Sequence, residues 1–87
     1  MEYFVYYIYS KKLDKFYIGK TNDLRRRLKE HNNGEEKYTQ KGAPWLLIGY
    51  IEYKNNNEAT KSELKLKKAK NPKYVNWYIK TYGKNTI

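Results

Sequence analysis

The sequence predicts one small mixed α/β (α+β) domain whose elements follow the order β-β-α-β-α-α. Three runs rich in aromatic and β-branched residues are typical of strands, and three segments preceded by capping residues are typical of helices. A chain of 87 residues is the size of one domain, and no linker, repeat or low-complexity stretch divides it. We therefore expect a single domain over residues 1–83, followed by a tail of residues 84–87.

The first two strands form a predicted hairpin. Residues 3–9 are aromatic and β-branched, and the polar residues 10–15 predict a turn. Residues 16–18 return as the second strand, which Gly19 ends. The third strand, residues 45–53, is almost entirely apolar, as expected for a central strand that is covered on both faces.

The first predicted helix begins after residues 21–23, any of which can cap it, and ends at residues 32–34. One face carries, at helical spacing, Leu24, Leu28 and His31. A polar loop, residues 35–44, then leads to the third strand.

Two further helices complete the predicted domain. One covers residues 58–70 after capping Asn residues at positions 55–57, and the other begins at Pro72, a residue tolerated in a first turn. The candidates to face inward are Ala59, Leu64 (or Glu63) and Leu66 in the second helix, and Val75, Tyr78 and Ile79 in the third.

The charge of the chain is strongly positive, with 19 Lys and Arg against 9 Asp and Glu, a formal net charge of +10. Residues 54–87 hold nine Lys and two acidic residues (net +7), and residues 1–53 hold ten basic and seven acidic residues (net +3). This balance favours a polyanionic partner, with the Lys-rich C-terminal third as the surface that follows a phosphate backbone.

Several classes of site are excluded by composition. With no Cys and a single His, the chain has no disulfide framework, thiolate zinc site or multi-His metal site. No apolar run is long enough to span a bilayer, so we expect no membrane contact. The residue types left for chemistry are Tyr, Arg, His and Glu. They suit phosphodiester hydrolysis, which needs a base, a cation for the transition state and a carboxylate for a divalent metal.

An ordered set of motifs resembles the GIY-YIG nuclease superfamily, above all its small stand-alone bacterial members, over residues 3–79. The motifs are Phe4-Val5-Tyr6, Tyr17-Ile18-Gly19, Asp23-Leu24-x-x-Arg27-Leu28-x-x-His31-Asn32, Lys37-Tyr38-Thr39, Pro44-Trp45-x-Leu47, Glu58-Ala59-x-x-x-Glu63 and Lys67. The resemblance implies a three-stranded antiparallel sheet flanked by helices. It also implies a metal-dependent endonuclease that cleaves DNA in the bacterial cytoplasm or nucleoid, in repair or recombination.

The resemblance also implies roles for the two tyrosine motifs. Tyr6 would lie near the attacking water as the general base or its helper, and Tyr17 would bind or orient the water and the phosphate. Gly19 is structural and allows close approach of the backbone. The first motif lacks its usual Gly, so a register shifted by one would replace Tyr6 with Tyr7. Neighbouring strand residues face opposite sides, so only one of them enters the site, and we favour Tyr6 because Val5 then fills the apolar position.

Three further residues complete the site implied by the resemblance. Arg27 would bind the scissile phosphate and offset the charge that grows in the transition state. His31 would hydrogen-bond the phosphate, shuttle a proton or protonate the leaving oxygen. Glu63 would be the single protein ligand of Mg²⁺ (or Mn²⁺), which keeps several waters and needs few carboxylates. The residues alone also allow packing roles for the tyrosines and His31, and an exposed ion pair between Glu63 and Lys67.

The expected partner is nucleic acid, most simply DNA, and no obligate protein partner is indicated. The expected substrate-binding residues, besides Arg27, are Tyr38, Thr39, Lys61, Lys65, Lys67, Lys68 and Asn76. Asn71 is the alternative to Asn76 as the Asn that often follows the family's Glu. A monomer is favoured because one small site cuts one strand at a time. The alternative functions are a non-catalytic nucleic-acid-binding domain on the same fold and an RNA or ribosome association driven by charge.

Overall fold

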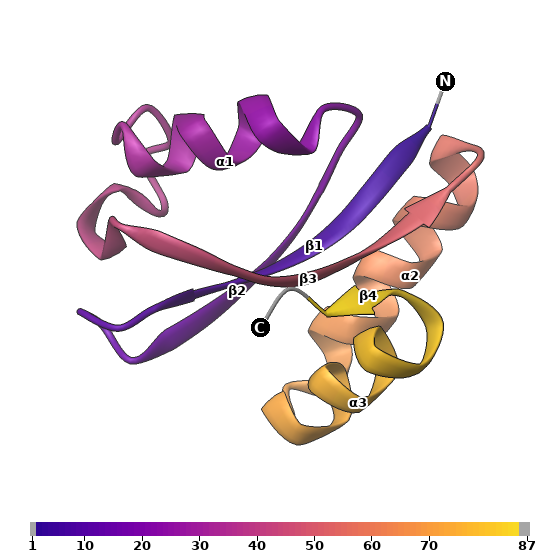
Figure 1. Cartoon of the computed structure of the whole chain (residues 1–87). Helices are drawn as coiled ribbons and strands as arrows, with labels where there is room; N and C mark the ends of the chain where they lie inside the picture. The colour runs from indigo at the N-terminus through magenta and orange to yellow at the C-terminus, as the bar shows by residue number, and fades with distance from the viewer. Residues whose placement is uncertain (1, 86–87) are drawn as a thin grey trace.

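The computed structural model describes residues 2–85. Its elements are, in chain order, β1 (Tyr3–Ser10), β2 (Lys15–Thr21), α1 (Leu24–Asn32), the 3-10 turn η1 (Gln40–Gly42), β3 (Trp45–Tyr53), α2 (Asn56–Ala69), α3 (Pro72–Tyr82) and β4 (Lys84–Asn85). Over the described residues the strands form one antiparallel sheet in the order β2-β1-β3-β4. In Figure 1, α1 lies over one face of the sheet, and α2 and α3 lie over the other. The predicted element order and the antiparallel sheet of β1, β2 and β3 are confirmed.

The central strand β1 sets the register of the molecule because it pairs with both β2 and β3. Tyr6 lies opposite Gly19 in β2 and opposite Tyr50 in β3. Its neighbour Tyr7 lies opposite Ile18. Since side chains alternate along a strand, Tyr6 and Tyr7 point to opposite faces of the sheet.

Two hydrophobic clusters fill the two faces. The larger cluster contains Val5, Tyr7, Ile51, Ala59, Leu66, Val75 and Ile79, and thus joins β1 and β3 to α2 and α3. The smaller cluster contains Tyr6, Ile8 and Trp45, with Leu24 and Leu28 of α1 packed against it. The face under α1 therefore holds the aromatic residue predicted to do chemistry, and the other face holds most of the apolar core.

Each helix begins at a polar side chain that accepts a hydrogen bond from the backbone N–H two or three residues later. Asp23 caps α1 (3.1 Å to the N–H of Arg26), and Asn55 caps α2 (2.8 Å to the N–H of Glu58). Asn71 caps α3, with Pro72 in the first turn. The predicted cap regions are confirmed, and α2 starts two residues before the predicted residue 58 because the first Asn of the run takes the cap.

The predicted inward face of α2 is wrong at Leu64, whereas the side chain of its alternative, Glu63, is only 17% exposed. Leu64 is 53% exposed, whereas Ser62 is buried and its hydroxyl accepts a hydrogen bond from Tyr53 Oη at 2.7 Å. Ala59 and Leu66 are fully buried, as predicted. A buried serine carries no hydrophobic signal, so periodicity in the sequence assigned the inward position to the nearest leucine.

The predicted tail begins with a short strand. Lys84 and Asn85 form β4 and pair with Tyr50 and Gly49 of β3, while residues 86–87 lie outside the described part of the chain. A Cβ on Gly83 would overlap the carbonyl oxygen of Tyr50, so a glycine permits this close approach. The domain boundary at residue 83 stays a prediction. Among the described residues, no helix has the length and apolar character needed to span a membrane.

Candidate active site

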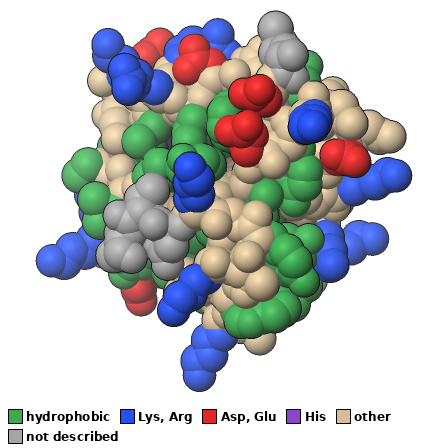
Figure 2. All heavy atoms as spheres, turned by 45° about the vertical axis from the view of Figure 1, so that its right-hand side comes forward, with side chains coloured by type: hydrophobic (Ala, Val, Ile, Leu, Met, Phe, Trp, Pro, Cys, Tyr) green, Lys and Arg blue, Asp and Glu red, His purple; other side chains and the backbone are tan. Residues whose placement is uncertain are grey.

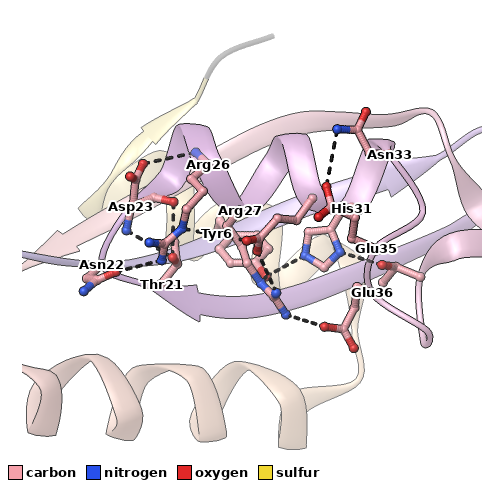
Figure 3. Close-up of polar contacts among 12 residues, drawn as sticks. Tyr6, Thr21, Asn22, Asp23, Arg26, Arg27, His31, Asn33, Glu35 and Glu36 are labelled. Atoms are coloured by element: carbon pink, nitrogen blue, oxygen red, sulfur yellow. Dashed lines mark hydrogen bonds and ion pairs between the residues drawn. The ribbon is translucent and has the colours of Figure 1, made fainter.

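The candidate site is built around the hydroxyl of Tyr6, which is 2% exposed and lies under α1. Its Oη is 2.8 Å from Nε2 of His31, and Arg27 donates to the same oxygen from Nε at 3.4 Å. Figure 3 shows these two α1 side chains reaching toward the tyrosine. They lie four residues apart and therefore on one face of the helix. The predicted spacing of Arg27 and His31 thus brings both to the phenol of β1.

Gly19 leaves room for the ring of Tyr6. The two residues are paired across β1 and β2, and a Cβ on Gly19 would overlap Oη and Cζ of the tyrosine. An alanine at this position would push the phenol away from Arg27 and His31. The structural role predicted for this glycine therefore has a specific cause, which is the place that the Tyr6 ring occupies.

His31 is fully buried, with 0% of its surface exposed. Its Nδ1 is 2.5 Å from Oγ1 of Thr39, so both ring nitrogens have polar partners. Burial, and after it the positive charge of Arg27, lower the pKa of His31 below its usual value of 6.5. His31 is therefore neutral at pH 7 and can hold one proton on either nitrogen. It lies behind Tyr6 and contacts the phenol, so it can reach substrate only through that hydroxyl.

Arg27 links the buried phenol to the surface. Its guanidinium forms ion pairs with Glu30 (3.1 Å) and Glu36 (2.9 Å), and its side chain is 27% exposed. Of the five N–H donors of an arginine, these contacts and the bond to Tyr6 use three, so two have no partner among residues 2–85 and can meet a ligand. The hydrogen bond from Arg27 is the main cause that lowers the pKa of Glu36.

Tyr17 forms the second aromatic wall of the site. Its ring centroid is 6.4 Å from that of Tyr6 and 5.4 Å from that of His31. On its other sides lie Tyr38 at 5.8 Å and Trp45 at 6.4 Å. The side chain is half-buried, so one part packs against the site and another part meets solvent.

Glu63 approaches the site from α2. Its side chain is 17% exposed and pairs with Lys67 at 3.2 Å, and Nζ of Lys67 lies 5.7 Å from the centre of the Tyr17 ring. Burial is the largest cause that raises the pKa of Tyr6 to about 12, and the negative charge of Glu63 adds to it. The carboxylate is thus close enough for the phenol to feel its field. The ion pair with Lys67 that the residues alone allow is present, and the role of Glu63 as a metal ligand stays a prediction.

The family of the chain follows from its sequence. A family model described as the GIY-YIG catalytic domain matches residues 2–76. The chain belongs to the GIY-YIG family. It is 36% identical over 73 residues to a UPF0213 protein of Streptococcus pneumoniae, covering 83% of this chain and 74% of that protein. A UPF0213 protein of Enterococcus faecalis is 40% identical over 70 residues, or 77% and 78% of the two chains.

Among solved structures, the solution NMR structure of the UPF0213 protein BH0048 from Bacillus halodurans is 28% identical, with a TM-score of 0.49, over 87% of this chain and 93% of that one. The resemblance to the small stand-alone GIY-YIG proteins is confirmed by the family model and the relatives. Membership of the family implies a nuclease-like function that involves binding of nucleic acid, and GIY-YIG nucleases generally use divalent metals.

The donor set of this GIY-YIG domain fits a magnesium-like ion in one way only. The described residues contain no group of three or more His, Cys, Asp or Glu side chains that could hold a metal ion. Mg²⁺ binds through one or two carboxylates together with waters and substrate phosphates, so the single carboxylate of Glu63 fits this mode. Lys67 contacts Oε2 of this carboxylate, so Oε1 is the oxygen that an ion would meet first.

The two substrate contacts predicted on the loop after α1, Tyr38 and Thr39, differ in their exposure to solvent. Tyr38 is 82% exposed and free to meet a ligand. Thr39, predicted to approach the substrate, is instead 1% exposed, and its carbonyl oxygen accepts a hydrogen bond from Nε1 of Trp45 at 2.8 Å. Its hydroxyl points to His31, so Thr39 supports the site from behind.

The predicted asparagine is not placed at the site. Asn76 is exposed on α3, and it does not line the groove beside Tyr17 that Phe16, Tyr17, Tyr38, Lys67 and Lys70 help to form. Asn71, the alternative, lines that groove and caps α3. The structure thus brings Asn71, rather than the favoured Asn76, to the side of the GIY-YIG residues.

The predicted lysines lie on α2. Lys61 and Lys68 are exposed, and Nζ of Lys65 lies 5.0 Å from the ring centre of Tyr78. On the face that Figure 2 shows, Lys and Arg side chains are spread widely rather than gathered in one patch.

Sequence reasoning missed the two carboxylates that hold Arg27. Glu30, three residues later on the helix, is at a spacing that favours a pair, so this contact has a signal in the sequence. Glu36 lies in the loop after α1, where no periodicity indicates a partner.

Proposed function

We propose that this protein is a divalent-metal-dependent endonuclease that hydrolyses DNA phosphodiester bonds at Tyr6. The observation that carries the proposal is the environment of one phenol. It is buried, in contact with a neutral His31 and a charged Arg27, and beside Tyr17. Packing alone does not require a tyrosine hydroxyl to have two such partners.

Tyr6 would accept a proton from the attacking water while it passes its own proton to His31. With a pKa of about 12, the tyrosine is a neutral phenol at pH 7 and is not a base by itself. Neutral His31, 2.8 Å away, is able to take the phenolic proton at Nε2 as the water proton arrives at Oη. The resulting hydroxide would form a bond to phosphorus as the bond from phosphorus to the leaving oxygen breaks, and the proton taken by His31 would return through Tyr6 to that oxygen. Thr39 then holds the imidazole from its other side.

Arg27 would stabilise the charge that develops on the phosphate. Its two unused N–H donors suit the oxygens of a phosphodiester, and its Nε favours negative charge on Tyr6 during proton transfer. A bound phosphate competes with Glu36 for the exposed side of the guanidinium. Tyr17 would orient the water and phosphate from the open side of the site.

Glu63 would hold Mg²⁺ or Mn²⁺ together with phosphate oxygens of the substrate. When bound, the ion neutralises phosphate charge and supports departure of the leaving oxygen. The exposed lysines of α2, Lys61 and Lys68, and Lys65 beside them, would contact the DNA backbone without reading its sequence.

A cleavage assay tests this function. Wild-type protein is incubated at low salt with single-stranded, duplex, flap and four-way DNA, with and without Mg²⁺ or Mn²⁺. We expect cleavage that requires the metal and is lost in Glu63→Gln and Arg27→Ala. Lys80→Gln, which changes an exposed charge on α3, is the matched control and keeps activity. Absence of cleavage of every substrate with either metal, from protein that is folded, would exclude the nuclease.

One observation favours the second candidate, a non-catalytic nucleic-acid-binding domain. Arg27 and Glu63 are both already engaged in ion pairs, as residues of a purely structural network are. If the protein only binds nucleic acid, neither a chelator nor Glu63→Gln should change its affinity for DNA. The wild-type protein should then not cleave DNA.

A further inference from the structure

A groove with a volume of about 820 Å³ opens beside β2, and it is lined by Tyr17, whose ring also contacts His31 and Tyr38. Tyr17 and Phe16 of β2 line it, as do Tyr38 of the loop after α1 and the C-terminal end of α2. The groove thus shares one aromatic wall with the candidate active site. A hollow of this size accommodates a small organic group such as one nucleotide.

Two exposed aromatic rings line this groove, and two others, Trp77 and Tyr82, lie on α3. Tyr38 is 82% exposed and Phe16 is 43% exposed, although burying these side chains would stabilise a small domain. Phe16 is held in place by parallel stacking on Tyr7, with centroids 4.7 Å apart and planes 4° apart. Rigid, exposed rings beside a hollow are platforms on which nucleobases stack.

The charge at the groove is positive. Lys15, Lys67 and Lys70 line it, and Asp14 is its one acidic lining residue among those described. Asp14 already accepts a hydrogen bond from Tyr9 at 2.7 Å. The ion pairs of the described residues include Lys67 but neither Lys15 nor Lys70. Two ammonium groups are therefore available for phosphates on either side of a bound base.

We propose that this groove binds an unpaired nucleotide next to the scissile phosphate, so that the substrate is single-stranded or locally unpaired DNA. Bases in a duplex offer only their edges in the grooves, because their faces are stacked on one another. Stacking on Tyr38 needs an exposed base face, which only an unpaired strand presents. The inference rests on the proposed nuclease function, since Tyr17 joins the groove to the cleavage site.

Binding without cleavage tests the groove directly. The probe is an oligothymidine that contains one 2-aminopurine, whose fluorescence falls when the base stacks, and EDTA prevents metal-dependent cutting. We expect wild-type protein to bind this strand and quench the probe, and to bind a fully paired duplex of the same length less tightly. Tyr38→Leu should remove most of the quenching and weaken binding about tenfold. Lys70→Gln should lower the slope of log affinity against log salt by about 0.7.

Matched controls and a parallel assay separate this inference from the function on which it rests. Tyr82→Leu and Lys80→Gln change an exposed tyrosine and lysine of α3 that do not line the groove, and should bind as the wild type does. The groove proposal is wrong if the protein binds duplex as tightly as the single strand, or if Tyr38→Leu quenches the probe as the wild type does. This holds even if wild-type protein with Mg²⁺ cleaves DNA. If quenching depends on Tyr38 but the protein cleaves no DNA, the groove binds an unpaired nucleotide and the proposed nuclease activity is wrong.

Discussion

Two neighbouring tyrosines of β1 lie on opposite faces of the sheet, and their hydroxyls have different surroundings. Tyr6 and Tyr7 are each 2% exposed, and burial raises the pKa of each to about 12. The hydroxyl of Tyr6 contacts His31 and Arg27, whereas the hydroxyl of Tyr7 has no hydrogen-bond partner among the described residues. Burial and residue type are therefore the same, and the two positions differ in the polar partners of the hydroxyl.

The difference extends to the helices that cover each face. Under α1 a connected set of polar side chains surrounds Tyr6, and acidic residues balance the arginine. Under α2 and α3 the contacts are mostly apolar, and the lysines of α2 point outward. One face thus holds the connected polar network, and the other holds most of the apolar core.

The largest expected effect is on the rate of DNA cleavage, and it distinguishes the face of the sheet that holds Tyr6 from the apolar face. Tyr6→Phe removes the proposed proton acceptor and should slow cleavage by roughly 100- to 10,000-fold. Tyr3→Phe changes another tyrosine of β1, which packs on the apolar face, and should leave the rate within about twofold of wild type. Single-turnover cleavage with Mg²⁺ measures both, and circular dichroism verifies folding. A Tyr6→Phe rate close to wild type would show that the phenol is structural.

A second comparison concerns stability. Thr39→Val keeps the shape of the side chain but leaves a buried nitrogen of His31 without a partner, which should lower the free energy of unfolding by about 1–3 kcal/mol. Tyr7→Phe removes a buried hydroxyl that has no partner among the described residues, and should leave stability unchanged or raise it. Urea unfolding compares the two variants. Similar losses in both would contradict the distinction between the faces.

The pH dependence of stability should report the buried histidine. The pKa of His31 is lowered in the folded state, so the unfolded chain binds a proton more readily. The free energy of unfolding should therefore be complete above the unfolded pKa of about 6.5 and fall as the pH drops below it. Urea unfolding at about pH 7.5 and about pH 5.5 measures this, and His31→Gln should weaken the dependence. Glu36, whose pKa is lowered, stays ionised across this window. If the stability of His31→Gln depends on pH as that of the wild type does, groups other than His31 cause the pH dependence.

The smallest expected effect concerns the outward side of α2. Lys68→Gln should weaken DNA binding slightly and reduce the salt slope by about 0.7 to 0.9 for one lost phosphate contact. Lys12→Gln, in the exposed turn between β1 and β2, is the matched control and should leave the slope unchanged. Fluorescence anisotropy at several salt concentrations measures both. Equal slopes in the two variants would show that α2 does not contact the backbone.

Much of the fold could be predicted because its signals are local. The caps at Asp23, Asn55 and Asn71 and the aromatic strands are read from a few consecutive residues, and the structure has them. Ser62 and β4 could not be predicted in this way. A buried serine resembles an exposed one in a sequence, and β4 depends on pairing with residues more than thirty positions away.

The candidate site also contains residues whose places could be predicted from the sequence and residues whose places could not. The spacing of Arg27 and His31 placed them on one face of a helix, and motif order selected Tyr6 and Tyr17. Sequence reasoning put Thr39 toward the substrate, because a loop residue carries no periodicity that shows which way it points. It favoured Asn76 over Asn71, because both follow Glu63 in the chain and the sequence does not show which of them comes near Tyr17. The structure turns Thr39 inward to His31 and brings Asn71 to the groove.

The sequence by itself determined that Tyr6 and Tyr7 face opposite sides of a strand, because side chains alternate along any strand. Only the tertiary structure decided which of them meets chemistry. His31 and Arg27 are 25 and 21 residues away from Tyr6 in the chain, and they reach it because α1 packs on that face of the sheet. Local geometry is set by neighbouring residues, whereas the partner of a buried hydroxyl is set by which helix covers it.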